Sequence, residues 1–464
     1  MTNKNSAKNA LQWIISIGIP LLILLIPVNE TFTAQMRLYL MITLIGILFF
    51  AFGNVKQTVV SFALPWAYVL TGVTTADVVF SPWATTTIWM FVGSFFLINA
   101  LTRCGLLNRI AYKTIVIFGG TYHGTLLGLT IISIIIGLVT GGCGAVPMLA
   151  LALGICKALN LEKFSKEATG IFLVAALGGC IPGYIFYNVT TILMINIGSS
   201  VGAPGTIGWF EHFFYGIPIL VYFFLSVLLV AFLFPASKKT NAAENRIHFS
   251  QLLHDLGPMH PAEIKAIIII GLMLFFMMTA TITNIDASYG FIIFPLLLYL
   301  PGINVGTEED LKAMDFGFVL FVAACLGIGM TGSALGFGEL VSNTILPLLQ
   351  DQGVWVFSGV VWLVCFVMNF LLTPFAIFAS FSAPLATLSM QLGIHPFATY
   401  FIMLIGADQL IFPYECAFYL IFFSYGVIRM EDFVKYFSAK ILLSLVVLFL
   451  ITLPFYKLIG YLYL

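Results

Sequence analysis

The stretch Ile264–Ile282, which reads IKAIIIIGLMLFFMMTATI, is long enough to cross a bilayer as a helix and carries Lys265 as its sole charge. A second apolar run, Ile441–Leu453, carries no charge. Neither run alternates apolar and polar residues as the strands of a membrane barrel do. The 464-residue chain is 61% hydrophobic and 8% charged, whereas soluble domains carry about 25% charged residues. Because a backbone in lipid must satisfy its own hydrogen bonds, the sequence predicts an all-α integral membrane protein.

Charge and cysteine usage exclude several other classes of protein. The net charge is zero, so no basic surface is expected to attract nucleic acid. The seven cysteines are scattered through apolar segments without a CxxC pair, which favours buried free thiols over disulfides or a zinc site. Residues 1–10 are polar, and the apolar run behind them lacks a small-residue cleavage site. We therefore expect a retained first span and no signal peptide.

Eleven segments have the length and composition of membrane spans. They are 11–28, 37–53, 58–73, 86–104, 167–200, 209–235, 264–283, 287–301, 315–335, 397–427 and 439–462. Two further apolar stretches, 123–160 and 354–393, are interrupted by Thr140-Gly-Gly-Cys-Gly144 and by Thr373-Pro374. A helix interrupted at membrane depth must cross twice or return as a re-entrant hairpin.

The distribution of basic residues favours the hairpins. If both stretches re-enter and the N-terminus is cytoplasmic, 17 of the 19 Lys and Arg residues, Lys440 among them, fall on the cytoplasmic side. Only Arg37 and Lys457 fall outside. Positively charged residues accumulate in cytoplasmic loops. The predicted topology is therefore eleven spans plus two hairpins in a cell membrane of the bacterial inner-membrane type.

The same order of parts occurs on both sides of a hydrophilic segment, 236–263, which we interpret as a cytoplasmic linker. The first half, 1–235, has an amphipathic segment (Leu106–Phe118), the hairpin 123–160 and a helix 167–200 broken at Pro182. The second half, 264–464, has an amphipathic segment (Phe337–Leu349), the hairpin 354–393 and a helix 397–427 broken at Pro413. An odd number of crossings separates the halves, which predicts an inverted repeat. Secondary transporters have this architecture, with the solute site where broken helices meet.

The order of parts and several local strings resemble the divalent anion/sodium symporter family. The strings are Val92-Gly-Ser-Phe-Phe-Leu-Ile-Asn-Ala100, Gly105-Leu-Leu-Asn-Arg109, Gly178-Gly179 ahead of Asn188, and Tyr215-Gly-Ile-Pro218. The resemblance covers nearly the whole chain. It implies a homodimer with a scaffold domain and an elevator-like transport domain. It also implies sodium-coupled uptake of dicarboxylate, citrate or sulfate.

The chain departs from that family where substrate and sodium are held. The family's hairpin tips carry Ser-Asn-Thr, but the matching positions here read Thr140-Gly141-Gly142 and Thr373-Pro374-Phe375. The family's Pro-Pro-Asn signature is also missing. Asn188 matches its Asn in the first half, while Pro413-Tyr-Glu-Cys-Ala-Phe-Tyr419 fills that region in the second half. The resemblance thus supports the fold more strongly than the usual substrate.

Two acidic residues within the tenth predicted span are candidates for ion coupling. Asp408 and Glu415 lie seven residues apart, about two helical turns, and would share one face of a continuous helix. A carboxylate in hydrocarbon is costly and commonly marks an ion or proton path. Either residue would bind sodium or carry a proton. The alternative is a structural carboxylate satisfied by its neighbours.

Neutral polar residues at the tips and breaks are the other candidates. We expect an anionic substrate to bind at the helix start and backbone amides of the first tip. Hydroxyl and amide groups elsewhere would add further contacts. These residues are Thr140, Gly141, Gly142, Cys143, Gly144, Asn188, Thr373, Pro374, Ser380, Ser382 and Tyr414. Asn188, Thr190 and Asn369 would contribute to ion coupling, and Pro182, Gly183 and Pro413 would break their helices and free carbonyls. The alternatives are glycines that permit tight packing and polar groups bonded to their own backbone. No Lys or Arg is expected at the middle of the membrane.

These observations favour a secondary active transporter, and not an enzyme. We expect it to move a small organic anion, such as a di- or tricarboxylate, with sodium or protons as the coupling ion and no cofactor. The alternative is a proton-coupled or exchange carrier for a monoanion, an amino acid or an inorganic oxyanion. An ion channel would need a continuous polar pore, and a membrane enzyme a catalytic cluster. Neither is visible in the sequence.

Overall fold

The computed structural model describes residues 2–52, 55–118, 121–141, 144–159, 161–236, 242–314, 316–337, 340, 352–370 and 373–464. Its regular elements are helices, as predicted for an all-α membrane protein. Six of the described helices are long and apolar enough to cross a membrane, or seven if the bent pair α5 and α6 counts as one span. Several others are shorter apolar helices of 10–17 residues. The count of eleven spans and their orientation stay predictions.

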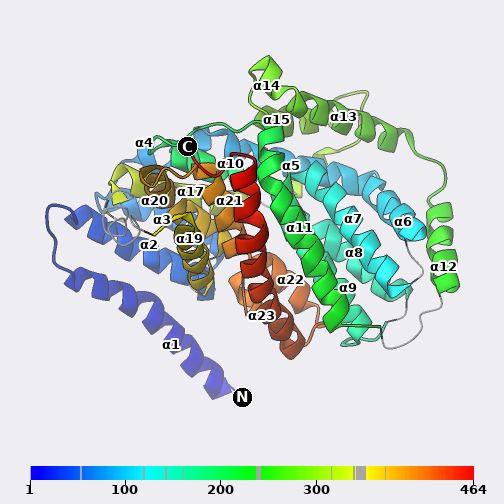
Figure 1. Ribbon diagram of the computed structural model, residues 1–464, viewed down its shortest axis with the longest axis horizontal. Helices are drawn as coiled ribbons and strands as arrows, with labels where there is room; N and C mark the ends of the chain where they lie inside the picture. The colour runs from blue at the N-terminus through cyan, green and yellow to red at the C-terminus, as the bar shows by residue number, and fades with distance from the viewer. Residues whose placement is uncertain are drawn as a thin grey trace.

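The first half begins with three apolar helices and continues into a hairpin and a broken helix. α1 (Thr2–Leu21) extends away from the rest of the chain in Figure 1. The following elements are α2 (Ala34–Phe52), α3 (Gln57–Leu70), α4 (Ala76–Val79), α5 (Thr86–Arg103) and α6 (Leu106–Phe118). The hairpin arms are α7 (Tyr122–Thr140) and α8 (Ala145–Ala158). The broken helix comprises α9 (Lys166–Cys180), the 3-10 turn η3 (Ile181–Ile185) and α10 (Val189–Ser199), before α11 (Trp209–Leu233).

The second half has the same order of elements. It begins with α13 (Pro261–Met278), α14 (Ala280–Thr283), α15 (Ser288–Leu297), α16 (Glu308–Lys312) and α17 (Phe316–Ala334). The hairpin arms are α19 (Val354–Asn369) and α20 (Pro374–Gln391). The broken helix comprises α21 (Pro396–Ala407), η4 (Pro413–Glu415) and α22 (Ala417–Ser424). The last helix runs from α23 (Met430–Val447) through a π-helical turn (Leu448–Thr452) into α24 (Leu453–Leu458). Most of the predicted amphipathic segment Phe337–Leu349 lies outside the described residues.

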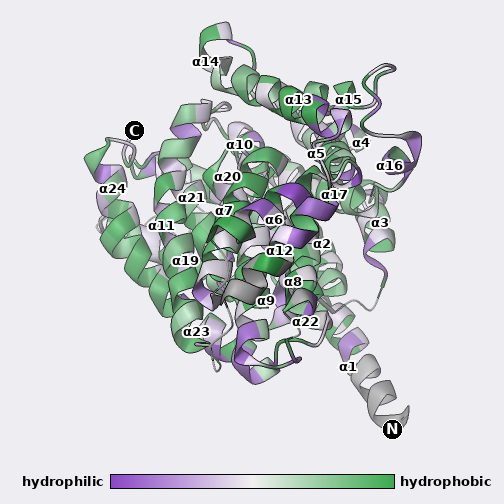
Figure 2. Ribbon diagram, turned by 90° about the vertical axis from the view of Figure 1, so that its right-hand side faces the viewer, coloured by the Kyte–Doolittle hydropathy of each residue, from purple (hydrophilic) through white to green (hydrophobic). Residues whose placement is uncertain are grey.

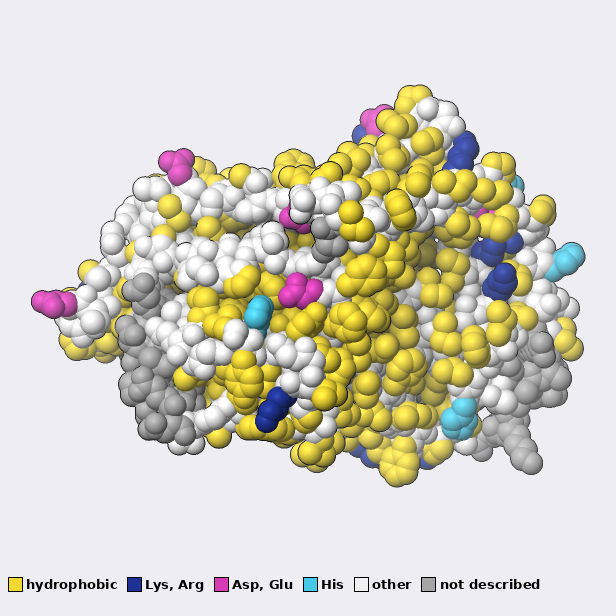
Figure 3. Space-filling view, turned by 45° about the horizontal axis from the view of Figure 1, so that its top comes forward, with side chains coloured by type: hydrophobic (Ala, Val, Ile, Leu, Met, Phe, Trp, Pro, Cys, Tyr) yellow, Lys and Arg dark blue, Asp and Glu magenta, His cyan; other side chains and the backbone are white. Residues whose placement is uncertain are grey.

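Two long helices separate the hairpins. α11 packs against α23, and the two run side by side through the middle of the molecule in Figure 1. The arms α7 and α8 with α9 lie on one side of this pair, and α19 and α20 lie on the other. Hydrophobic residues dominate the helices in Figure 2, while hydrophilic ones collect at helix ends and at α16. Charged side chains are few and isolated on the face shown in Figure 3. Such a surface matches a lipid environment.

Three boundaries differ from the sequence prediction. In the broken helix of the second half, the first part, α21, ends at Ala407 with Asp408 as its C-cap. The helix is thus interrupted six residues before Pro413, where the sequence predicts the break. The last span begins at Met430 and not at 439. The predicted linker contains a helix, α12 (Ala242–Asp255), which packs against α6. The Arg109 guanidinium of α6 donates to the carbonyls of Leu256, Gly257 and Pro258, which follow the end of α12.

Candidate functional site at the two helix breaks

The tip of the first hairpin is built for close packing. Gly141 ends α7 in the left-handed conformation (φ +60°), and a Cβ there would lie 2.8 Å from the Phe291 ring. Only glycine fits this combination without strain. The buried Thr140 hydroxyl donates to the Ile136 carbonyl of its own helix at 2.8 Å. Gly142 and Cys143, two of the predicted binding residues, lie outside the described residues.

The other glycines near this tip also serve packing. A Cβ on Gly179 of α9 would approach the Ala145 Cα at 2.7 Å, and one on Gly144 would lie 3.2 Å from the Ile136 side chain. The hairpin therefore lies in direct backbone contact with the broken helix. The close-packing alternative from the sequence analysis accounts for these contacts. The amides at the start of α8 have no side-chain cap, since Gly144 offers none.

The first helix break forms where the sequence predicts it. Pro182 and Gly183 lie in η3, between the end of α9 and the start of α10. Asn188 caps α10: its Oδ1 accepts from the Thr191 amide at 2.9 Å, and its Nδ2 donates to the Phe186 carbonyl at 2.8 Å. The backbone amide of Val189 reaches the Gly141 carbonyl at 3.4 Å, so tip and break are joined. Thr190, a predicted ion ligand, is buried in the first turn of α10.

The second tip is joined to the second break by an amide side chain. Asn369 ends α19, and its Nδ2 donates to the carbonyls of Ala407 and Gln409, both at 2.7 Å. Its Oδ1 is buried and has no partner among the described residues. Thr373 caps α20 by accepting from the Ala376 amide at 3.4 Å, and Pro374 takes the first helical position. The amide of Asn369 therefore holds the hairpin against the interrupted helix.

The two serines of α20 behave differently. The Ser382 hydroxyl bonds the Phe378 carbonyl of its own helix, which is the structural alternative. The Ser380 hydroxyl is buried and has no hydrogen-bond partner in the part of the chain that the structure describes. Ser380 thus remains available to a ligand, whereas Ser382 does not.

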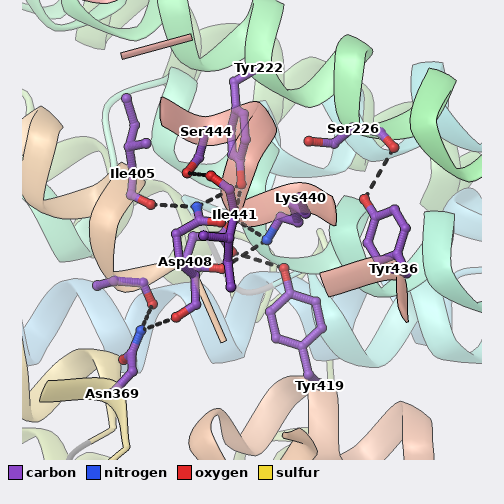
Figure 4. Close-up of polar contacts among 12 residues, drawn as sticks. Tyr222, Ser226, Asn369, Ile405, Asp408, Tyr419, Tyr436, Lys440, Ile441 and Ser444 are labelled. Atoms are coloured by element: carbon purple, nitrogen blue, oxygen red, sulfur yellow. Dashed lines mark hydrogen bonds and ion pairs between the residues drawn. The ribbon is translucent and has the colours of Figure 1, made fainter. Parts of the chain in front are cut away.

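Asp408 lies at the centre of a polar cluster at the second break (Figure 4). Its Oδ1 accepts from the Tyr419 hydroxyl at 2.9 Å and its Oδ2 from the Tyr222 hydroxyl at 3.0 Å. The Lys440 Nζ lies 2.6 Å from the same Oδ2 and donates to the Asp408 carbonyl at 2.8 Å. The side chains of Lys440 and Asp408 are 0% and 4% exposed. The pair is therefore a buried, neutral ion pair with every carboxylate oxygen bonded.

Lys440 corrects the expectation that no basic residue lies at the middle of a span. Because α23 begins at Met430, Lys440 lies ten residues into the helix, roughly 15 Å along its axis. Its ammonium also lies 4.9 Å from the centre of the Phe437 ring, within cation–π range. The signal that sequence analysis missed is the helical spacing of Phe433, Phe437, Lys440 and Ser444, which are all buried.

The two predicted carboxylates have different surroundings. The helix break at Asp408 means that Asp408 and Glu415 do not share one face of a continuous helix. The Glu415 carboxylate is buried and accepts from the backbone amides of Phe412, at 2.9 Å, and Ile411, at 3.3 Å. It thus caps the turn η4 that contains Pro413. The side chain of Tyr414, predicted to bind substrate, lies outside the described residues.

The structure brings the two breaks together. Asp408 lines a narrow crevice with residues of η3, α11 and α21, and the crevice has no room for a water-sized solute. The other lining residues are Ile181, Tyr184, Ile219, Tyr222, Leu404 and Ile405. The thiols of Cys180, which ends α9, and Cys416, which precedes α22, are hydrogen-bonded to each other. Among the described residues, no group of three or more His, Cys, Asp or Glu is placed to hold a metal ion.

Comparison with known proteins identifies relatives of the chain. The family model described as the sodium:sulfate symporter transmembrane region matches residues 7–462. A curated protein of Cupriavidus necator, named only "Membrane protein", is 24% identical over 263 residues. The alignment covers 54% of this chain and 49% of that relative, so the chain matches about half of the relative's length.

Proposed function

This chain belongs to the sodium:sulfate symporter family, and we propose that it carries a small organic anion, such as a di- or tricarboxylate, into the cell together with sodium. Membership in the family implies sodium-coupled anion transport by a multi-pass membrane protein. The di- or tricarboxylate, the bacterial inner membrane, the homodimer and the elevator-type movement are parts of the proposal.

The observation that supports the proposal is the joining of each hairpin tip to a helix break. In the first half the Val189 amide bonds the Gly141 carbonyl, and in the second half Asn369 bonds two carbonyls after α21. Each half therefore gathers helix ends, with the ends of their backbone dipoles, at one point inside the protein. Interrupted helices of this kind hold anions at helix starts and cations at free carbonyls in secondary transporters.

An anion would find its contacts at helix starts and neutral groups. Among the described residues, no side chain caps the amides at the start of α8, and the buried Ser380 hydroxyl has no hydrogen-bond partner. The positive end of a helix dipole favours an anion. We assign substrate contact to the first tip and to Ser380, and ion coupling to Asn188 and Thr190 at the first break.

Uptake by purified protein in liposomes tests this function. Labelled succinate, citrate, sulfate and glutamate are offered under an inward sodium gradient, an inward proton gradient or no gradient, with the membrane potential clamped. We expect saturable accumulation of an organic dianion or trianion only under the sodium gradient. Accumulation of sulfate or glutamate alone would replace the proposed substrate, and a current independent of any gradient would indicate a channel.

A substitution of Glu415 distinguishes sodium coupling from the proton-coupled alternative. The burial of the Glu415 carboxylate next to the break favours the proton-coupled alternative. A Glu415→Gln side chain still has an oxygen to accept from the Phe412 amide, so the cap is retained while the titratable group is lost. If sodium drives transport, this variant accumulates substrate as the wild type does. Loss of accumulation with surviving counterflow exchange would assign the coupling to a proton on Glu415.

A further inference from the structure

We propose that the Lys440 ammonium is a resident cation that fills a cation site at the second helix break, and that this break therefore takes no sodium while Lys440 is present. The proposal rests on the sodium coupling proposed above and specifies which half of the chain serves it. It assigns Lys440 a function as a specificity-determining residue.

The ligands of the ammonium are those of a cation site. Lys440 Nζ bonds a carboxylate oxygen of Asp408 at 2.6 Å and the backbone carbonyl of the same residue at 2.8 Å. That carbonyl is free because α21 ends at Ala407 and no helical amide follows to bond it. Freed carbonyls and carboxylates at interrupted helices are the groups that coordinate sodium in transporters.

The charges at this point require a cation. Asp408 contributes one negative charge, and the C-terminus of α21 contributes the negative end of its dipole. Burying such charge without a partner is strongly unfavourable. The rings of Phe437, Tyr419 and Tyr222 surround the ammonium at 4.9–5.7 Å and add cation–π stabilisation. Without Lys440 the same pocket would attract a small cation from solution.

Side chains of the protein also donate hydrogen bonds to the neighbouring carbonyls. The amide of Asn369 bonds Ala407 and Gln409, and the Gln409 side chain bonds the Ile405 carbonyl at 2.7 Å. The carbonyls of residues 405, 407, 408 and 409 thus each have a side-chain donor. The first break differs: among the described contacts around Asn188, its partners are Phe186, Thr191 and His212, with no Lys or Arg. The coupling sodium is therefore assigned to the first half.

Sodium binding to purified protein tests the proposal without a substrate. The number of sodium ions per chain is measured by equilibrium binding of labelled sodium in choline buffer for the wild type and for Lys440→Ala. We expect Lys440→Ala to bind about one more ion per chain than the wild type. Lys435→Ala is the matched control, since Lys435 is exposed on the same helix, and it should bind as the wild type does. The double variant Asp408→Asn/Lys440→Ala should lose the additional ion.

A folded Lys440→Ala protein that binds no more sodium than the wild type would overturn the proposal. If the Lys440→Ala protein is monodisperse only in some salts, sodium chloride should restore its monodispersity, and choline chloride of equal ionic strength should not. Equal recovery in both salts, or in neither, would show a purely structural ion pair. Failure of the proposed function gives a different result. The wild type then shows no sodium-driven uptake, but Lys440→Ala still binds more sodium per chain than the wild type.

Discussion

The buried pair of Asp408 and Lys440 allows a quantitative prediction from a double-mutant cycle. Asp408→Asn leaves a fully buried ammonium without its carboxylate, and Lys440→Met leaves the carboxylate without its ammonium. Removing one partner of a buried ion pair costs about 3–5 kcal/mol. Removing both leaves no unpaired charge, although an Asn side chain offers one fewer acceptor to the two tyrosine hydroxyls. One unsatisfied hydroxyl costs about 1–3 kcal/mol.

The single substitutions together should therefore cost roughly 6–10 kcal/mol, whereas the double variant should cost only about 1–3 kcal/mol. The difference is a coupling energy of at least about 3 kcal/mol, well above the range for a residue pair without contact. The free energy of unfolding is measured by titration with SDS, with tryptophan fluorescence as the signal. The buffer contains choline in place of sodium, so that no ion replaces the missing ammonium.

Lys435→Met is the control in this cycle, because Lys435 is exposed on the same helix and should change the free energy of unfolding by no more than about 0.5 kcal/mol. Additive effects of the two substitutions, within about 0.5 kcal/mol, would refute the reasoning, since they would show that the two charges do not depend on each other in the folded protein.

Two further substitutions test the joints between hairpins and breaks. Gly179→Ala places a Cβ 2.7 Å from a backbone atom of α8 and should destabilise the protein by about 1–3 kcal/mol; the exposed Gly154, whose Cβ would meet nothing within 4 Å, should tolerate alanine in the same thermal-stability assay. Asn369→Ala removes the donor from two buried carbonyls, at a cost of about 1–3 kcal/mol for each, and should reduce liposome uptake sharply. Ser382→Ala is its control and should transport normally; equal loss in both variants would contradict the assigned role of Asn369.

Much of the architecture follows from local patterns. Apolar length alone predicts membrane helices, and the glycine and proline interruptions at residues 140–144 and 373–374 predict two hairpins. These features are local because lipid imposes the same requirement on every segment. Each helix must satisfy its backbone hydrogen bonds within itself. The structure has α7 and α8, and α19 and α20, on either side of these interruptions, and the break at Pro182 lies in η3; that the two pairs re-enter the membrane stays a prediction.

The candidate site was only partly predictable. Asp408 is conspicuous because a carboxylate in an apolar run is costly, but its partner Lys440 lies 32 residues away, near the cytoplasmic end of a predicted span. A basic residue near a span end normally extends to the interface, so its position along the chain gives no reason to bury it. Only the tertiary packing, in which α11 contacts both α21 and α23, brings its ammonium to the carboxylate.

The sequence by itself determined that this chain is a helical membrane protein and where its helices are interrupted, because those properties depend on hydrophobicity and backbone bonding within each segment. The tertiary structure alone decided which polar groups meet. It put Lys440 on Asp408, Asn369 on the carbonyls after α21, and the two helix breaks against each other, since such contacts depend on distances between segments that are remote in sequence.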